Sequence, residues 1–390
     1  MSVNTMGIEQ AYSLIAQLHS MATGNTSITP TDESSFISVA QATLVNGYDP
    51  VLSAISQVIG RTLIAVRPYE RKFGGLEMSA ERWGAVVRKI SFLDTAPQAN
   101  PTFALVDGVA VDPFIVKKPQ VIETRYVGSD IWQGQYTLFT RQLDVAFSSA
   151  SEFASFMSGL MLHFANEREQ WLENMARATV ANFIAAKNQL SNSIIHVLSE
   201  YNTATGASPA YTSTTIRQPD VFPAFVRWLY ARVEELSKKM TERSELFQLQ
   251  LTGAHIVRHT PLADQKIYIL ADFLAHMEAE VLSDTYHDNY LKMADVEAVG
   301  FWQAIDTPDS LTVTPALIDA SGAIDTGTSQ VMTDVIGVIF DRDAIGYNIA
   351  QDTLDTSVYN PAGQYYNLFN NVRVMYTNDL TEKGIVLVLD

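Results

Sequence analysis

The chain has 390 residues, of which 47% are hydrophobic and 18% charged, so it is long enough for two or three folded cores or for one core with long extensions. Its 26 Lys and Arg against 43 Asp and Glu give a net charge of −17, and no block of basic residues occurs, which argues against tight binding of nucleic acid. The absence of cysteine excludes disulfides, cysteine-ligated metals and cysteine nucleophiles.

Residues 1–60 are predicted to form an arm. They contain two modest amphipathic stretches, Ile8–Met21 and Ser34–Val45, separated by a polar run. Neither stretch has enough apolar residues to close a core alone, which disfavours a small independent domain, so we expect apolar residues such as Ile15 and Leu18 to be buried only after subunits associate. The first 20 residues lack the pattern of a secretory signal, and no segment reaches the roughly 20 apolar residues of a membrane helix, so we expect folding in the cytosol without a membrane.

A long projecting loop is predicted from Arg61 to Val127. Short β-type runs occur at Thr62–Val66, Ala85–Ile90 and Ile115–Val116, and clusters of Gly and Pro separate them. Because proline removes donors from a β-ladder, a compact buried sheet is improbable here. Extended hairpin structure fits the pattern better.

The strongest local prediction is one long helix. It follows Ile131–Phe147, whose alternating polarity predicts a half-buried strand. Ser148–Glu152 then supplies a serine cap and an acidic first turn. Apolar residues recur at helical spacing from Phe153 to Lys187 without a proline, which predicts a spine on the order of 50 Å long.

The next segment alternates strand and helix signals. Asn188–Ala210 is predicted to form a β-hairpin, and a second helix should begin at Gln218–Asp220 and run to a charged end at Lys238-Lys239. Leu246–Leu251 is predicted to be a strand. Thr260–Glu280 is predicted to be a helix with proline in its first turn.

The last part of the chain is predicted to contain strands. Val296–Phe301 and Val335–Phe340 are apolar enough to be buried, and Asp306–Gln330 between them has the composition of an exposed loop. Leu368–Tyr376 and Lys383–Leu389 should form a closing strand pair across a turn at residues 377–379.

This order of elements resembles the major capsid proteins of tailed bacteriophages. The HK-ninety-seven-type fold of these proteins is shared with herpesvirus capsid floors and encapsulin shells. The residues that carry the resemblance best are Gly337–Gly346, Asn370–Val374 and Gly384–Leu389, since such endings are typical of the family. The resemblance covers essentially the whole chain and implies an α+β fold, most similar to that of a short-tailed phage.

The resemblance also implies a domain organisation. It predicts an N-terminal arm at 1–60 and an extended β-hairpin loop at 61–128. A peripheral domain should follow at 129–216, with its spine helix at about 149–187, and an axial domain at 217–350. Residues 351–390 should form return strands of the peripheral domain.

The function implied by the resemblance is structural. Such a protein self-assembles as hexamers and pentamers into the icosahedral shell that encloses the double-stranded DNA of a tailed phage, without catalysis or a cofactor. Expected partners are copies of itself, a portal, packaged DNA contacted non-specifically, and a separate scaffolding protein, because the arm is too short for a large fused scaffold. The protein is expected in the virion, after assembly in the host bacterial cytoplasm. An encapsulin-type cellular shell is the alternative.

A different class, a metal-dependent hydrolase, would use His255 and His259, with Asp264 nearby. Structural histidines are favoured, because residues 254–257 continue a strand-like run and no HExxH pattern occurs. Asp341-Arg342-Asp343 is better explained as an ion pair in a turn than as an acid–base pair, since neighbouring strand residues face opposite sides. No GxGxxG, P-loop or GxSxG pattern is present. We therefore expect no catalytic, cofactor or metal site.

Aromatic residues are the remaining candidates for contact surfaces. Aromatic side chains bury large areas and are enriched where proteins meet, although most are ordinary core residues. The candidates are Trp83, Trp132, Tyr365, Tyr366 and Phe369.

Overall fold

A computed structural model of the chain gives the fold. The residues that it describes are 7–26, 29–45, 49–55, 71–78, 86–93, 105–110, 112, 114, 116, 118, 120–127, 129–190, 192–253, 256–282, 296–325 and 327–390. Within these ranges, no helix has both the length and the apolar character that crossing a membrane requires.

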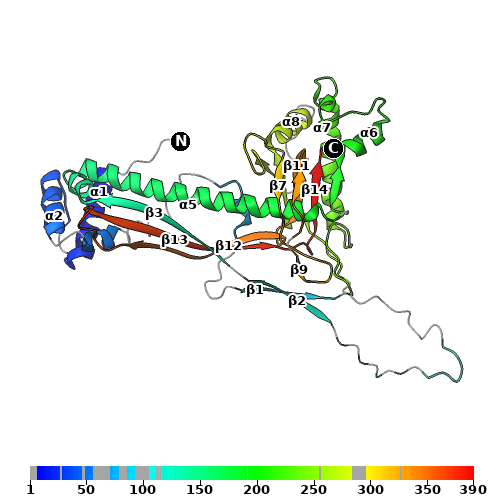
Figure 1. Cartoon of the computed structure of the whole chain (residues 1–390), viewed down its shortest axis with the longest axis horizontal. Coiled ribbons are helices and arrows are strands. Elements are labelled where there is room, and N and C mark those ends of the chain that lie inside the picture. Colours follow the sequence, from blue (N-terminus) through cyan, green and yellow to red (C-terminus); the bar gives the residue numbers. More distant parts are fainter. Residues whose placement is uncertain are drawn as a thin grey trace. The chain divides into compact units, whose positions relative to one another are not determined.

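The chain forms two compact units. The first consists of residues 1–85, 129–175 and 348–375, and the second of residues 86–128, 176–347 and 376–390. Three continuous elements contribute residues to both units: α5 (Ala150–Lys187), β12 (Ile345–Thr356) and β13 (Tyr365–Asn378) (Figure 1). The chain therefore passes repeatedly between the units within regular secondary structure.

The long helix α5 confirms the strongest prediction from the sequence. Its 38 residues give a length of about 57 Å at the normal rise per residue. In the first unit, a three-stranded antiparallel sheet has the order β12-β13-β3, with β3 at Asp130–Phe139. Alternate residues of β13, including Leu368 and Val372, are buried, as expected for a sheet with one face in a core.

The strand predicted at Ile131–Phe147 is too long. It ends at Phe139, and α4 (Thr140–Ala146) follows directly. The side-chain oxygen of Gln142 accepts the backbone N–H of Phe139 at 3.1 Å and so satisfies an amide that the helix leaves free. This local cap favours a helical turn over a continued strand.

The two N-terminal helices are part of the core of the first unit. The amphipathic stretches are confirmed as α1 (Ile8–Thr23) and α2 (Glu33–Val45), but the expectation that neither is buried within the subunit is wrong. Ile15, Leu18 and Phe36 are fully buried in one cluster with residues of α4, α5 and β13. The covering residues lie more than 100 positions downstream, so the local sequence did not reveal them.

Residues 71–78 are also packed within the first unit. Phe73 is fully buried, and its backbone N–H donates to Glu173 of α5 at 3.2 Å. Arg71 pairs with Glu169 of the same helix at 2.6 Å. This part of the predicted projecting loop therefore lies against the spine helix, while the strand predicted at Thr62–Val66 falls outside the described residues.

The second unit is built on a five-stranded mixed sheet. Its order is β4-β14-β11-β5-β6, in which β11 pairs antiparallel with both neighbours and the two edge strands run parallel to theirs. The strands are β4 (Ile194–His196), β14 (Gly384–Val388), β11 (Val335–Asp341), β5 (Gln265–Leu270) and β6 (Val296–Val299). Besides the end of α5, its described helices include α6 (Val197–Thr205), α7 (Phe222–Thr241) and α8 (Ala271–Leu282). The predictions for β6, α7 and β11 are confirmed.

Three predictions in the second unit are wrong in part. Residues 265–270 form β5 rather than a helix, because their apolar side chains are buried within the sheet, and α8 begins only at Ala271. Residues 246–251 form turns and irregular chain rather than a strand. Among the described residues from 188 to 210, β4 is the only strand, and α6 takes the place of the middle of the predicted hairpin and is capped by Gly206, whose φ is 62°.

The predicted closing strand pair does not form. Both strands exist, but β13 pairs with β12 and β3, whereas β14 pairs with β11 and β4. The region predicted as an exposed loop at 306–330 contains the short strands β7 (Leu311–Val313), β8 (Leu317–Ile318), β9 (Ile324–Asp325) and the start of β10 (Gln330–Met332). Strand partners depend on contacts that are distant in sequence.

The burial of α1 generates a stability test. Ile15→Ala removes a side chain that is fully buried and should lower the free energy of unfolding by about 2–5 kcal/mol. Ile8→Ala on the same helix changes a side chain that is 54% exposed and should alter it by less than about 0.5 kcal/mol. Urea unfolding of the dissociated subunit measures both. Equal midpoints for the two variants would show that α1 does not stabilise the unit.

Candidate functional site

The second unit carries a two-stranded antiparallel hairpin of β1 (Val86–Phe92) and β2 (Val121–Val127). The prediction of a strand at Ala85–Ile90 is thereby confirmed, but the second strand lies at 121–127, and Val116 is not in a strand. Phe92 faces Val121, and the N–H of Leu93 donates to the carbonyl of Gln120 at 2.9 Å. Because strand side chains alternate, the hairpin has two faces of different composition.

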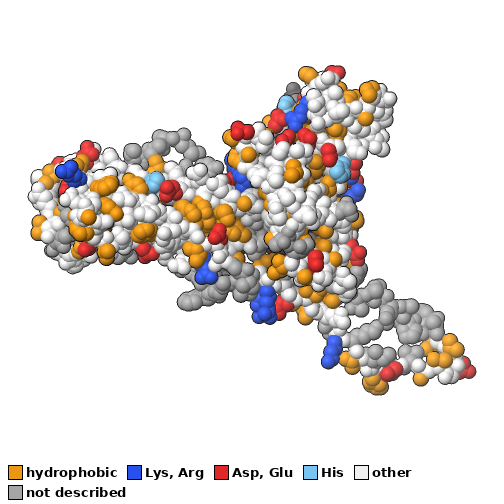
Figure 2. Space-filling view, in the orientation of Figure 1, with side chains coloured by type: hydrophobic (Ala, Val, Ile, Leu, Met, Phe, Trp, Pro, Cys, Tyr) orange, Lys and Arg blue, Asp and Glu red, His pale blue; other side chains and the backbone are white. Residues whose placement is uncertain are grey.

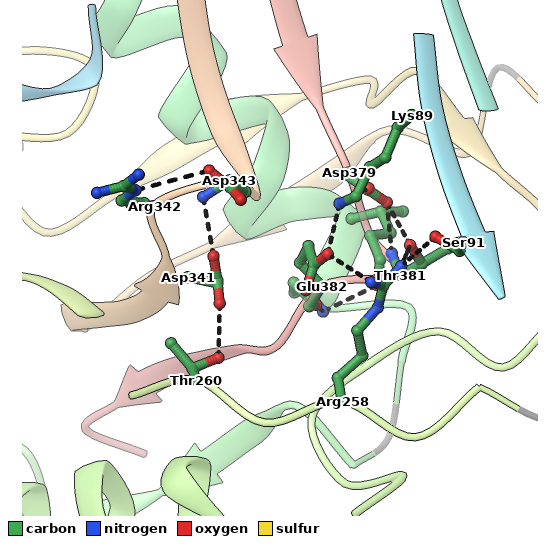
Figure 3. A network of polar contacts seen from close by, with 12 residues as sticks. Lys89, Ser91, Arg258, Thr260, Asp341, Arg342, Asp343, Asp379, Thr381 and Glu382 are labelled. Atoms are coloured by element: carbon green, nitrogen blue, oxygen red, sulfur yellow. Dashed lines mark hydrogen bonds and ion pairs between the residues drawn. The ribbon is translucent and has the colours of Figure 1, made fainter. Parts of the chain in front are cut away.

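We call the face that carries Lys89 and Ser91 the inner face. Lys89 Nζ lies 2.6 Å from Asp379 Oδ2 and also donates to Glu382 Oε1 (Figure 3). Arg258 reaches the same place, with Nη1 3.0 Å from Glu382 Oε1 and Nη2 donating to Ser91 Oγ at 2.9 Å. Three segments of the second unit thus meet at one cluster of charges.

The acidic members of this cluster lie in the turn 379–382 between β13 and β14, and that turn is internally braced. Asp379 Oδ1 accepts both the backbone N–H of Thr381 at 2.9 Å and its hydroxyl at 2.6 Å. The backbone N–H of Asp379 donates to the carbonyl of Ala344 at 2.7 Å. The side chains of Asp379 and Glu382 are only 2% and 7% exposed, so their positions are fixed and nearly dry.

Burial and the cations act against each other on these groups. Burial alone would lower the pKa of Lys89, but the carboxylates of Asp379 and Glu382 outweigh it and raise that pKa. Burial alone would raise the pKa of Asp379, but Lys89 and the bonds from Thr381 hold it below its usual value. Burial raises the pKa of Glu382 despite Lys89 and Arg258. The ion pair of Lys89 with Asp379 is therefore the firmest link between the hairpin and the unit.

A second lysine holds the same turn from the end of α5. Lys187 is fully buried, and its Nζ donates to the carbonyl oxygens of Phe247 at 2.9 Å, Leu380 at 3.2 Å and Glu382 at 3.0 Å. An ammonium group has three donors, so every one is used. Burial lowers the pKa of Lys187 to about 7. The turn is thus fixed on one side by β1 and on the other by the spine helix.

The acidic sequence Asp341-Arg342-Asp343 lies in a turn, as predicted. Arg342 Nη1 is 3.3 Å from Asp264 Oδ1, and Arg342 Nε is 3.7 Å from Asp343 Oδ1. Asp341 accepts the hydroxyl of Thr260 at 2.8 Å and the N–H of Asp343 at 2.9 Å (Figure 3). These contacts brace the end of β11.

The histidines that the structure describes do not form a recognisable site. His255 and His287 lie outside the described residues, and His259 is exposed. His276 is 3.7 Å from Asp272 on the surface of α8. Within the described ranges, no group of three His, Asp or Glu side chains could hold a metal ion.

The aromatic candidates for contact surfaces differ in their burial and in their ring contacts. Trp83 lies outside the described residues, and Tyr366 is buried in the core of the first unit. Trp132 stacks on Trp171 with ring centroids 5.3 Å apart, and Tyr365 contacts Phe139 edge-on at 6.1 Å. Phe369 is half-buried on β13.

Sequence reasoning missed the charge cluster at the inner face. Lys89 lies next to Arg88 in a short strand whose side chains alternate between two faces, so one of these two charges must point toward the protein and requires a partner there; that was the available signal. Its partners are 290 and 293 residues away, in a segment that the sequence marked only as a turn. Nothing local connects the two.

The lowered pKa of Lys187 generates a prediction about pH. The pKa of Lys187 is about 7 in the folded chain and should have its ordinary value of 10.5 in the unfolded chain. At a pH between these two values, the unfolded chain binds one proton more at this residue than the folded chain does. Stability therefore rises with pH across this range. The stability advantage of the wild type over Lys187→Met should grow by about 2 kcal/mol from about pH 7 to about pH 9. Urea unfolding of the dissociated subunit measures this difference. A constant difference would show that the pKa is not lowered.

The inner-face ion pairs generate a second prediction. Lys89→Met leaves the Asp379 and Glu382 carboxylates buried with one cation fewer, at a cost of about 3–5 kcal/mol. Hydrogen–deuterium exchange of residues 86–93 should accelerate by about 100-fold or more. Arg88→Met, on the exposed side of the same strand, is the control and should change exchange by less than about tenfold. Similar exchange in both variants would contradict the role given to Lys89.

Comparisons with known proteins agree on one family. The sequence matches the model of the Phi29-like phage major capsid protein over residues 16–388, which is nearly the whole chain. No curated protein matches the sequence significantly. The family match favours a phage shell over the encapsulin-type alternative.

Solved structures give the same fold. A chain of the capsid of Staphylococcus phage Andhra is 12% identical with a TM-score of 0.57, and the match covers 84% of this chain and 86% of that chain. A chain in the structure of the head fiber and inner core protein gp22 of native bacteriophage P68 is 11% identical with a TM-score of 0.53, covering 82% of this chain and 85% of that chain. The predicted α+β fold of the HK-ninety-seven type is confirmed. Since the family model spans almost all of its residues, the chain belongs to the Phi29-like phage major capsid proteins and is a shell-forming structural protein.

Proposed function

We propose that copies of this chain associate as hexamers and pentamers into an icosahedral shell around the double-stranded DNA of a tailed phage. The observation that carries this proposal is the hairpin, which is held to its own subunit by one face, while the apolar side chains described on its other face and in the loop beyond it are exposed. The shell assembles in the host cytoplasm and becomes part of the virion. Its work is mechanical, so no catalytic step is required.

The expected peripheral and axial domains can be assigned to the two units as part of this proposal, although the bounds of the units differ from those expected. In this proposal the first unit is the peripheral domain, with α1 and α2 built into it rather than forming a free arm. The second unit is the axial domain, and the hairpin with its loop projects from it to reach a neighbouring subunit. The hairpin and its loop are then the parts proposed to bridge subunits.

The loop beyond the hairpin supports association. Its described apolar side chains are exposed, and Figure 2 shows hydrophobic side chains at its far end. These side chains are Leu105, Val106, Val109, Phe114 and Val116. A soluble monomer rarely leaves such a group uncovered, and contact with another subunit removes it from water.

The charge of the chain supports a passive relation to DNA. A net charge of −17 disfavours strong attraction to phosphates, so DNA is enclosed and contacted only non-specifically. The same charge makes subunits repel one another. A separate scaffolding protein that brings subunits together, and a portal through which DNA enters, complete the proposed set of partners.

The loop can be tested without disturbing the hairpin. Replacing residues 94–119 with Asn-Gly joins Leu93 to Gln120, which already face each other, through a turn that suits a two-residue hairpin. The shortened subunit should melt like the wild type, because the inner-face contacts remain. It should fail to form shells in sedimentation and negative-stain microscopy, with or without a co-expressed scaffolding protein.

The control for this experiment is hydrogen–deuterium exchange of residues 86–93, which should be the same in both proteins. Closed shells formed equally well by the shortened subunit would refute the role of the loop in assembly.

A further inference from the structure

The outer face of the hairpin, opposite Lys89, has a composition unlike the rest of this acidic chain. It carries two arginines, one glutamate and three apolar residues, and each arginine and apolar side chain is more than half exposed. These residues are Arg88, Ile90 and Phe92 on β1, and Val121, Glu123 and Arg125 on β2. Phe92 is 70% exposed. The face is therefore apolar at one end and basic at the other.

Among the described residues, the two arginines of the basic end share a single carboxylate. Arg88 and Arg125 face each other directly across the two strands, an arrangement that is unfavourable for like charges. Both guanidinium groups bond the same oxygen, Glu123 Oε1, at 2.6 and 2.7 Å. Hydrogen bonds from Arg88 and Arg125 lower the pKa of Glu123 to about 2, which is consistent with a local excess of positive charge. One carboxylate thus serves two cations.

We infer that the outer face of the hairpin binds an acidic surface on a second copy of this chain. The inference rests on the proposed function, since it names the surface that the projecting hairpin meets. A second copy carries a net charge of −17 and so offers carboxylates that would complement the arginine pair. The adjacent Ile90, Phe92 and Val121 would be buried in the same contact.

A DNA phosphate is the competing occupant, and it fits less well. Phosphates would engage the arginines, but they would leave Ile90, Phe92 and Val121 without an apolar partner. A protein surface can satisfy both ends of the face.

Salt has opposite effects on the two kinds of charge interaction. Added salt screens the repulsion between subunits of like net charge, which favours assembly, and it also screens the arginine contacts, which opposes assembly. The contribution of the outer face is therefore measured by comparing variants of equal net charge at one salt concentration.

The test variant is Arg88→Gln/Glu123→Gln/Arg125→Gln, which removes two positive charges and one negative charge. The control is Arg342→Gln, which also changes the net charge by −1 and alters an arginine in a turn of the same unit. The triple variant should need a subunit concentration about tenfold higher for assembly, and the control should match the wild type. Arg88→Lys/Arg125→Lys keeps both charges and should assemble within about threefold of the wild type. Sedimentation measures all four proteins.

Folding is checked by hydrogen exchange of residues 86–93, which should stay unchanged because the inner-face pairs remain. If the triple variant assembles like the wild type while the shortened loop abolishes assembly, the inference fails and the proposed function stands. If the triple variant and the shortened loop both assemble normally, the inference and the proposed function both fail. Normal assembly of the triple variant into shells that retain less DNA would assign the face to DNA and overturn the inference.

Discussion

The arrangement of the second unit depends on keeping two carboxylates, Asp379 and Glu382, charged and nearly dry in one turn. A buried carboxylate without a partner is too costly to persist, so cations must be brought to it. Lys89 and Arg258 supply them, while Lys187 binds the carbonyls of the same turn. The attached hairpin therefore stabilises the turn, and the charged turn in return holds the hairpin in place.

The period of a β-strand lets this short hairpin serve two purposes. Because successive side chains face opposite sides, Lys89 and Ser91 can be fixed to the subunit while Arg88, Ile90 and Phe92 remain outside. A helix of seven residues would spread its side chains around an axis and could not separate them so completely. Substitutions on the inner face should therefore change the attachment of the hairpin to its own subunit, and substitutions on the outer face should change contact between subunits.

The sequence predicted elements whose signal is local and failed where partners are distant. The spine helix, α7 and β11 were predicted because apolar spacing within each segment determines their type. The burial of Ile15 and the separate pairing of β13 and β14 were not, because they depend on chain segments more than 100 residues away or on which sheet each strand joins. The candidate site was missed for the same reason, since Lys89 and Asp379 are 290 positions apart. The family resemblance succeeded because it used the order of elements rather than their contacts.

The charges on the inner and outer faces of the hairpin differ in burial, and salt therefore screens them to different extents. The pair of Lys89 with Asp379 is largely desolvated, so salt screens it weakly, whereas Arg88 and Arg125 are exposed and are screened within about 10 Å at moderate ionic strength. A change in ionic strength therefore acts first on contacts between subunits and leaves the hairpin attached to its own. A shell built in this way can form and dissociate while each subunit keeps its fold, which a protein that assembles from many identical copies requires.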